Sequence, residues 1–136
     1  MRTSRRGRRG QSGAALIMAL LVLFLLSMVL ALLAESLLLR MRMARDEAET
    51  VAVDSLSDSA LEEAMAELAL DPNYSGASEH DFGGGTIQTK VQSLNPGLYD
   101  VTATATYGLR HRVVEAQVFR GGGGGVTIRH WRRVPG

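Results

Sequence analysis

The sequence predicts an α+β protein in which one long N-terminal helix precedes a small antiparallel sheet of three or four strands. Three observations lead to this prediction. Residues 14–34 are uniformly apolar, residues 35–70 contain neither glycine nor proline, and the chain from residue 83 alternates between apolar and polar side chains. The expected parts are a basic segment at 1–13, a membrane-spanning helix at 14–34, an amphipathic continuation at 35–71 and a β domain at 72–136.

The composition limits what the chain can do. Its 136 residues suffice for one small soluble domain at most. Because the sequence has no cysteine, a disulfide framework, a thiol nucleophile and a zinc–thiolate site are all excluded. The net charge of +1 is unevenly distributed: the five charges in residues 1–13 are all arginines, and the remainder has 10 basic and 14 acidic residues.

The apolar segment at 14–34 predicts a membrane helix. It has 21 residues without a charge, and Ser27 is its only polar member. A helix of that length covers about 31 Å, close to the hydrocarbon thickness of a bilayer. The segment is apolar on every side, and the chain is too short to bury such a helix in a large core. We therefore expect this helix to lie in lipid.

The flanking charges predict the orientation of the span. Five arginines precede it without an acid, whereas Arg40, Arg42 and Arg45 follow it together with acidic residues. This bias favours a cytoplasmic N-terminus, with the residues after Ala34 outside the membrane. An ordinary secretory signal peptide is an alternative, with cleavage near Ala34 or Ser36, although the run exceeds the usual apolar length of about 7–15 residues.

Residues 9–18 read RGQSGAALIM: a basic stretch, a glycine and then the apolar helix. This junction resembles the leader junction of type IV prepilins and of the pseudopilins of type II secretion. The resemblance implies cleavage by a prepilin peptidase between Gly13 and Ala14, followed by methylation of the new N-terminus. A residue without a side chain would let the peptidase approach the backbone closely.

The family pattern is not complete in this chain. Most members have an aromatic residue at mature position 1 and a glutamate at position 5, where this chain has Ala14 and Met18. The G-A-A-L start and the C-terminal TIRHWRRV are most similar to PilX-type minor pilins, with the K-type pseudopilin as a relative. The resemblance implies a pilin-like fold. It also implies three kinds of partner: the prepilin peptidase, other pilins and an inner-membrane assembly platform. The expected location is the bacterial inner membrane, followed by a fibre or its tip.

The helix should continue past the membrane with one apolar face. The residues of this stripe recur every three or four positions, which is helical spacing; they are Val53, Leu56, Ala60, Ala64 and Leu68, widened by Leu61 and Met65. We expect the stripe to pack on the sheet and the helix to end at Asp71-Pro72-Asn73, because proline disfavours a helical residue before it.

The polar side of the same helix is acidic, with Asp54, Asp58 and Glu62 four residues apart. Like charges at this spacing destabilise a helix slightly. One interpretation is a solvated face. The other is that these acids meet basic surface on neighbouring subunits, including the cluster of Arg40, Arg42 and Arg45.

The C-terminal half predicts an antiparallel meander. Alternating segments at 86–93, 98–108, 110–120 and 126–131 are separated by Asn95-Pro96-Gly97, by Gly108 and by the pentaglycine 121–125. One face should pack on the helix stripe, and the threonine-rich face should be wet.

No catalytic chemistry is predicted. The pentaglycine lacks the Lys-Ser/Thr of a phosphate-binding loop, and His80, His111 and His130 are too scattered for a metal site. We expect no enzymatic activity, no cofactor, no metal and no nucleic-acid partner. The leading hypothesis is a minor pilin or pseudopilin. A bitopic regulatory module with an uncleaved N-terminus and an exported soluble binding protein remain as alternatives.

Overall fold

The computed structural model describes residues 8–135, with side chains described from residue 11. The chain divides into two compact units, and the boundary lies between Ala44 and Arg45. Helix α1 (Arg8–Leu70) provides the described part of the first unit and the helical part of the second. The rest of the second unit is a sheet whose strands are β1 (His80–Phe82), β2 (Gly85–Asn95), β3 (Leu98–Tyr107), β4 (Arg110–Arg120) and β5 (Val126–Val134).

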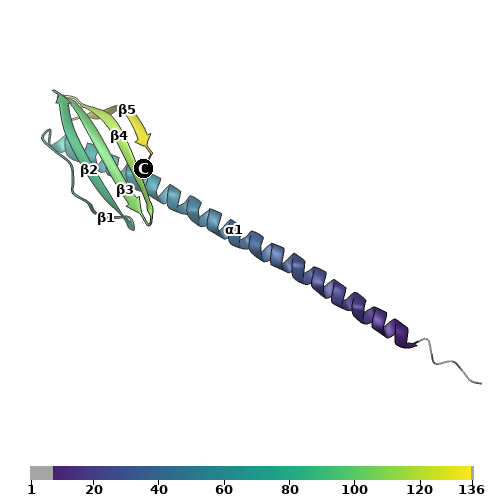
Figure 1. The fold of residues 1–136 in the computed structure, drawn as a ribbon. Coiled ribbons are helices and arrows are strands. Elements are labelled where there is room, and N and C mark those ends of the chain that lie inside the picture. The colour runs from purple at the N-terminus through teal and green to yellow at the C-terminus, as the bar shows by residue number, and fades with distance from the viewer. Residues whose placement is uncertain (1–7, 136) are drawn as a thin grey trace, which may run out of the picture. The chain divides into compact units, whose positions relative to one another are not determined.

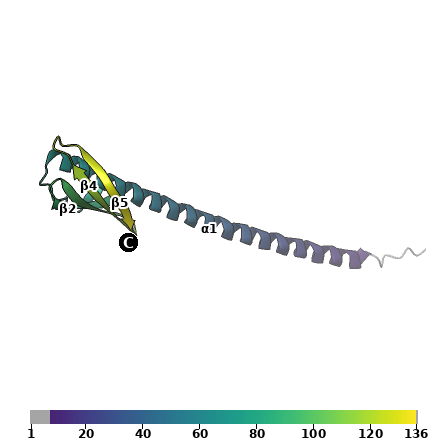
Figure 2. The ribbon, with the colours of Figure 1, turned by 90° about the horizontal axis from the view of Figure 1, so that it is seen from above.

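The fold class is α+β, as predicted, and the order of the elements is also as predicted. The strands follow one another in the sheet in chain order, each antiparallel to its neighbour (Figure 1). Within the second unit, residues 45–70 of α1 lie across one face of this sheet (Figure 2). The helix ends at Leu70, directly before the Asp71-Pro72-Asn73 stop signal.

The prediction of three or four strands was wrong, because residues 8–135 contain five. The missed strand is β1, which has only three residues and so has no alternation that could reveal it. It forms because Gly83 and Gly84 have positive φ values of 56° and 84°, which permits a tight hairpin onto β2.

Among its described side chains, from residue 11 to residue 44, the first unit has no core of its own. Every residue from 11 to 44 is exposed, including its many leucines. Within the described residues, α1 is the one helix long and apolar enough to cross a membrane. An exposed apolar helix of this length is compatible with a membrane anchor, because lipid would replace water around its side chains.

The second unit has a single core between helix and sheet. The predicted stripe is buried: Val53, Ala60, Ala64 and Leu68 are at most 1% exposed. The inward residues of three strands meet this stripe; they are Ile87 and Val91 of β2, Tyr99, Val101, Ala103 and Ala105 of β3, and Val114, Ala116 and Val118 of β4. Burying each large aliphatic side chain contributes about 1.5–3 kcal/mol.

The two edges of the sheet differ. At the β1 end, the segment between α1 and β1 continues the pairing along the outer edge of β2. Thr89 N–H donates to the Ala77 carbonyl at 3.1 Å, and Val91 N–H donates to the Ser75 carbonyl at 3.0 Å. Gly76 between them has a φ of 110°, and a Cβ there would lie 2.2 Å from the Thr89 carbonyl oxygen. At the other edge, β5 follows the pentaglycine hairpin and, among the described residues, pairs with β4 alone.

The C-terminal end of α1 is capped by a side chain from the sheet. Arg120, the last residue of β4, donates from Nε to the Leu68 carbonyl at 2.8 Å and from Nη2 to the Ala69 carbonyl at 3.1 Å. The last carbonyls of a helix have no partner within the helix and carry its partial negative charge. The Arg120 guanidinium donates hydrogen bonds to these carbonyls and its positive charge offsets their partial negative charge, so it fixes the helix end to the sheet.

Candidate functional site

The candidate processing junction lies within the helix. Gly13 and Ala14 are both helical and exposed, while residues 1–7 of the expected leader lie outside the described residues. No heavy atom would lie within 4 Å of a Cβ at Gly13, and its φ is not positive. Since glycine costs a helix interior about 0.5–1 kcal/mol relative to alanine, neither packing nor backbone conformation explains this residue.

Met18 is also fully on the surface of the helix. Its side chain is 66% exposed, and the flanking Ile17 has the same exposure. Position 18 therefore has no packing role within the described chain. The side chain at position 18 can therefore act only on molecules that contact this helix from outside the described chain.

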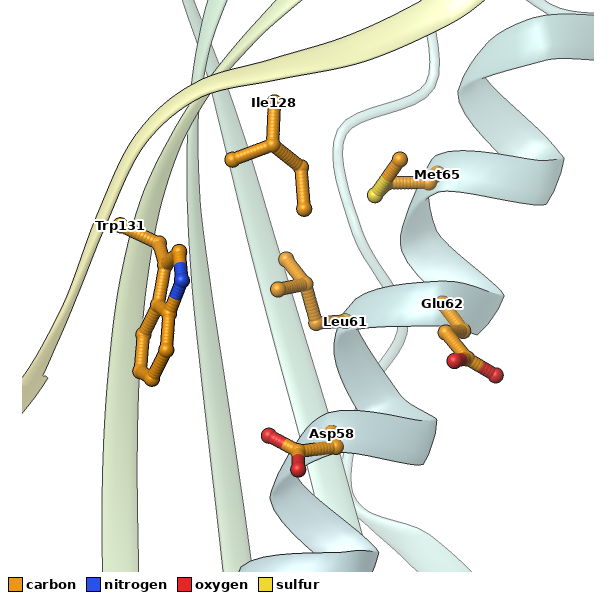
Figure 3. A pocket seen from close by; sticks show the side chains of 6 residues that line it. All are labelled: Asp58, Leu61, Glu62, Met65, Ile128 and Trp131. Carbon is orange, nitrogen blue, oxygen red and sulfur yellow. The ribbon is translucent and has the colours of Figure 1, made fainter.

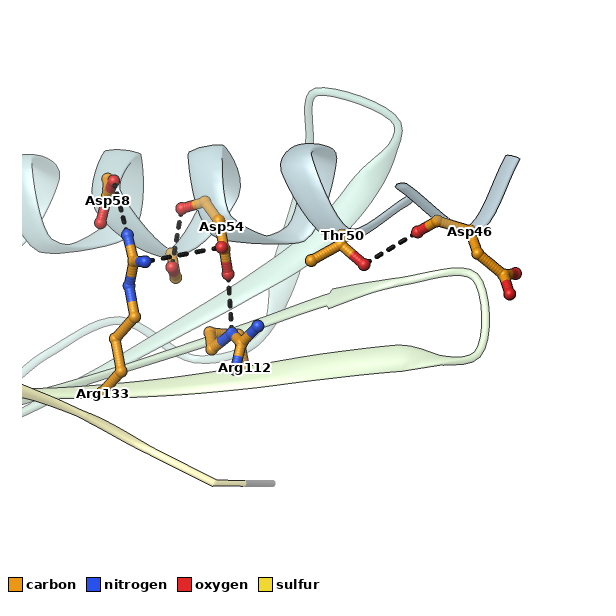
Figure 4. A network of polar contacts seen from close by, with 7 residues as sticks. Asp46, Thr50, Asp54, Asp58, Arg112 and Arg133 are labelled. Carbon is orange, nitrogen blue, oxygen red and sulfur yellow. Dashed lines mark hydrogen bonds and ion pairs between the residues drawn. The ribbon is translucent and has the colours of Figure 1, made fainter. Parts of the chain in front are cut away.

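The acidic face of residues 54–62 is partly engaged inside the second unit. Asp54 Oδ1 accepts a hydrogen bond from Arg112 Nε at 2.7 Å, and its Oδ2 lies 3.6 Å from Arg133 Nη1. Arg133 Nη2 also lies 3.6 Å from Asp58 Oδ2, so one guanidinium bridges two acids of the helix (Figure 4). The interpretation of a merely solvated face therefore does not describe Asp54.

The two arginines have partners that were not predicted from the sequence. Arg112 is in phase with Val114 and Val118 on β4, so strand alternation alone places it on the helix side. Arg133 could not be placed in this way. The register between β4 and β5 shifts at Gln117/Val118, and Arg129 is left without a partner in the ladder.

The bulge at Arg129 also creates a surface feature. Across the ladder from the inward-facing Val118, Ala116 and Val114 lie Ile128, Trp131 and Arg133. Ile128 and Trp131 therefore face α1 although they are three residues apart. Together with the helix they line a groove of about 270 Å³ (Figure 3); its lining residues are Asp58, Leu61, Glu62, Met65, Ile128 and Trp131.

The groove combines an apolar floor with an acidic rim. Leu61 is 7% exposed, whereas Ile128 is 42% and Trp131 is 49% exposed. Arg133 lies over the Trp131 ring, with its guanidinium carbon 5.3 Å from the ring centroid. Trp131 thus lies at the margin of the core, half in contact with solvent.

The predicted basic cluster has a different environment. Arg45 donates from Nε to Glu49 one turn further along, at 3.2 Å. Arg40 and Arg42 are exposed, and neither forms an ion pair with a residue in the range 8–135. Glu62 likewise has no ion pair within that range.

A histidine links the helix to β1. His80 donates from Nδ1 to the Ser78 carbonyl at 2.9 Å, and its Nε2 lies 3.5 Å from Glu63 Oε2. The hydrogen bond to Ser78 is the largest cause that raises the pKa of His80 above its ordinary value of 6.5, and the charge of Glu63 adds to it. Within the described residues, no three His, Asp or Glu side chains are arranged to hold a metal ion.

Comparisons with known proteins do not place the chain in a family: no family model, no curated protein and no solved structure matches it.

Proposed function

We propose that this chain is a minor type IV pilin or pseudopilin, processed after Gly13 and assembled through its helix into a pilus or a priming tip complex. The observation on which the proposal rests is the glycine itself. Gly13 stands between a basic segment and a fully exposed apolar helix, at a position where neither packing nor φ calls for glycine. A peptidase that must reach the backbone supplies the missing reason.

Two further features support the proposal. A long apolar helix that continues into an amphipathic half on a small antiparallel sheet is compatible with the coarse pilin-like layout. The apolar surface of residues 14–34 also needs surroundings other than water. A bilayer provides them before assembly, and the helices of other subunits would provide them afterwards. Since lipid is as apolar as leucine, association between such helices must come from packing and placed charges.

The deciding experiment is the mass and N-terminal sequence of the native protein from membranes, with and without the prepilin peptidase of its host. A methylated start at Ala14 that disappears without the peptidase would support the proposal. An intact Met1 would favour the bitopic regulatory module instead. A start beyond residue 31 would mean ordinary secretion.

A pair of substitutions makes this test specific. Gly13→Leu should leave the leader attached, because its side chain would obstruct access to the peptide bond. Gln11→Leu adds the same side chain two residues earlier and should still be cleaved. If both variants were processed equally, the glycine would have no role in processing.

The proposal also assigns a role to Met18. The resemblance to pilins implies that the glutamate at mature position 5 pairs with the N-terminal amine of a neighbouring subunit. Met18 has no carboxylate for this contact, so we expect the subunit to start or cap a fibre rather than fill its shaft. Met18→Glu should increase incorporation along the fibre. Ile17→Glu places the same charge at an equally exposed neighbouring position and should not. Equal incorporation of wild type and Met18→Glu would remove the basis for this role.

A further inference from the structure

The groove between α1 and β5 has the properties of an unoccupied contact surface. Two large apolar side chains, Ile128 and Trp131, lie half exposed beside the buried Leu61. The bulge at Arg129 places both on the side of β5 that faces the helix, and the rest of the described chain leaves them partly uncovered. Clustered exposure of this kind marks an interaction surface more often than scattered surface leucines do.

The charges on the rim specify what could bind there. Asp58 is 56% exposed and shares Arg133 with Asp54 at a distance of 3.6 Å. Glu62 is exposed and has no ion pair within residues 8–135. An occupant should therefore combine apolar side chains with at least one cation.

The chain itself contains such a segment. Leu38 and Met41 are 58% and 69% exposed, and Arg42 is exposed without an ion pair in the described range. These three residues lie on one face of α1, because their spacing of three and four residues is that of adjacent helical turns. The groove repeats this spacing with Asp58, Leu61 and Glu62. The Leu38–Arg42 face thus offers two apolar side chains and one cation, and the groove offers apolar side chains beside two acids of opposite charge.

We propose that the groove binds the Leu38–Arg42 face of a second copy of this chain. Leu38 and Met41 of the second copy cover Leu61 and Trp131, and Arg42 pairs with Glu62. The groove volume of about 270 Å³ equals that of roughly nine liquid water molecules, so it receives side chains rather than a whole helix. This inference rests on the proposed function, since it names the contact between assembled subunits.

Cross-linking tests the contact directly, because a chain without cysteine carries only the thiols that are introduced. One tagged copy carries Met41→Cys and a differently tagged copy carries Met65→Cys, both full length and co-expressed in a host with its assembly machinery. A disulfide needs Cα atoms within about 7 Å, so a mixed dimer reports a close contact. Trp131 fluorescence of the Met65→Cys variant checks that the domain is folded.

Met43→Cys is the matched control. Met43 is 68% exposed, against 69% for Met41, but two residues along a helix it points to a different side. We expect the Met41–Met65 species to exceed the Met43–Met65 species several-fold. Equal yields would overturn the inference, because they would indicate collision rather than a specific contact.

A charge exchange tests the ion pair. Glu62→Arg should reduce the Met41–Met65 cross-link several-fold, and Arg42→Glu in the second copy should restore most of it. Glu67→Arg reverses an exposed acid of the same helix that does not line the groove, and it should leave the yield unchanged. Failure of the restoration with the folded double variant would show that Arg42 is not the partner of Glu62.

The peptidase-deficient host separates this inference from the proposed function. If the chain is processed at Ala14 but gives no Met41–Met65 species, the groove has another occupant and the pilin proposal stands. If Met1 is retained in the host that has its peptidase, the pilin proposal fails whether or not the cross-link forms. A cross-link of unchanged yield without the peptidase would show that the two copies meet at the groove before processing, so the contact would stand and its link to fibre assembly would be overturned.

Discussion

Residues 11–44 and residues 45–70 belong to one helix but have opposite relations to water. The first segment exposes every side chain, and most of those side chains are apolar. The second segment buries Val53, Ala60, Ala64 and Leu68 against the sheet. Its exposed residues include the acids Asp58, Glu62 and Glu67. Helix formation is common to both, since each consists of strong helix formers. The arrangement of apolar residues, all round in one and in a single stripe in the other, decides what each segment must contact.

The largest expected effect on stability comes from shortening a side chain of α1 that is buried in the core. Leu68→Ala, at a fully buried position, should lower the free energy of unfolding of the second unit by about 2–5 kcal/mol. Leu25→Ala removes the same atoms at a position 51% exposed and should change it by less than about 0.5 kcal/mol. Urea unfolding in mild detergent, followed by fluorescence of the single Trp131, measures both. Equal losses would mean that the first segment also contributes to the core.

The end of the buried half provides the next test. Arg120→Met keeps much of the side-chain length but removes both hydrogen bonds to the carbonyls of Leu68 and Ala69. We expect a loss of about 1–3 kcal/mol in the same assay, because part-buried carbonyls lose a charged donor. Arg129→Met is the comparison: that guanidinium stacks on Phe119 at 5.0 Å, and its removal should cost less than about 1 kcal/mol.

A smaller effect is expected from the acidic side of the buried half. Asp54→Asn weakens the contacts to Arg112 and Arg133, and since the Asp54 side chain is 25% exposed, the loss should be about 1 kcal/mol or less. Added salt should reduce the difference from wild type. Asp58→Asn, at a side chain 56% exposed, should have the weaker effect of the two. A larger loss at Asp58 would contradict the ranking by burial.

The smallest expected effect depends on pH. The pKa of His80 is raised in the folded state, so its contribution to stability is complete below the ordinary value of 6.5 and is lost as the pH rises through the raised value. The stability difference between wild type and His80→Gln should therefore be larger at pH 5.5 than at pH 8.5. Because Glu63 contributes to the shift, Glu63→Gln should reduce this pH dependence. A difference that grew with pH would contradict the assignment.

Much of this architecture could be predicted from the sequence. The stripe from Val53 to Leu68 and the alternation in β2, β3 and β4 each specify a buried face directly, because their periods match their secondary structures. Strand β1 could not be predicted, since its three residues carry no period and its pairing depends on the Gly83-Gly84 turn.

The groove was beyond prediction for a different reason. Strict alternation along β5 would place Ile128 with His130 on one face and Trp131 on the other. The bulge at Arg129 reverses the phase and brings Ile128 to the same side as Trp131 and Arg133. A change of phase of this kind is decided by strand pairing and leaves no mark in local composition. By contrast, the phase of Arg112 with Val114 was readable, and following it would have placed Arg112 on the helix side of the sheet, where it contacts Asp54.

The cap that Arg120 provides also has a consequence for the order of synthesis. The residue that satisfies the Leu68 carbonyl lies 52 positions later in the chain. At about 5–20 residues per second, the ribosome adds Arg120 roughly 3 to 10 seconds after Leu68. During that interval the Leu68 and Ala69 carbonyls lack their Arg120 donor, so we expect the last turn of the helix to fray until the end of β4 has been made. The helix is therefore the first element to be made, but its final turn should be among the last to become ordered.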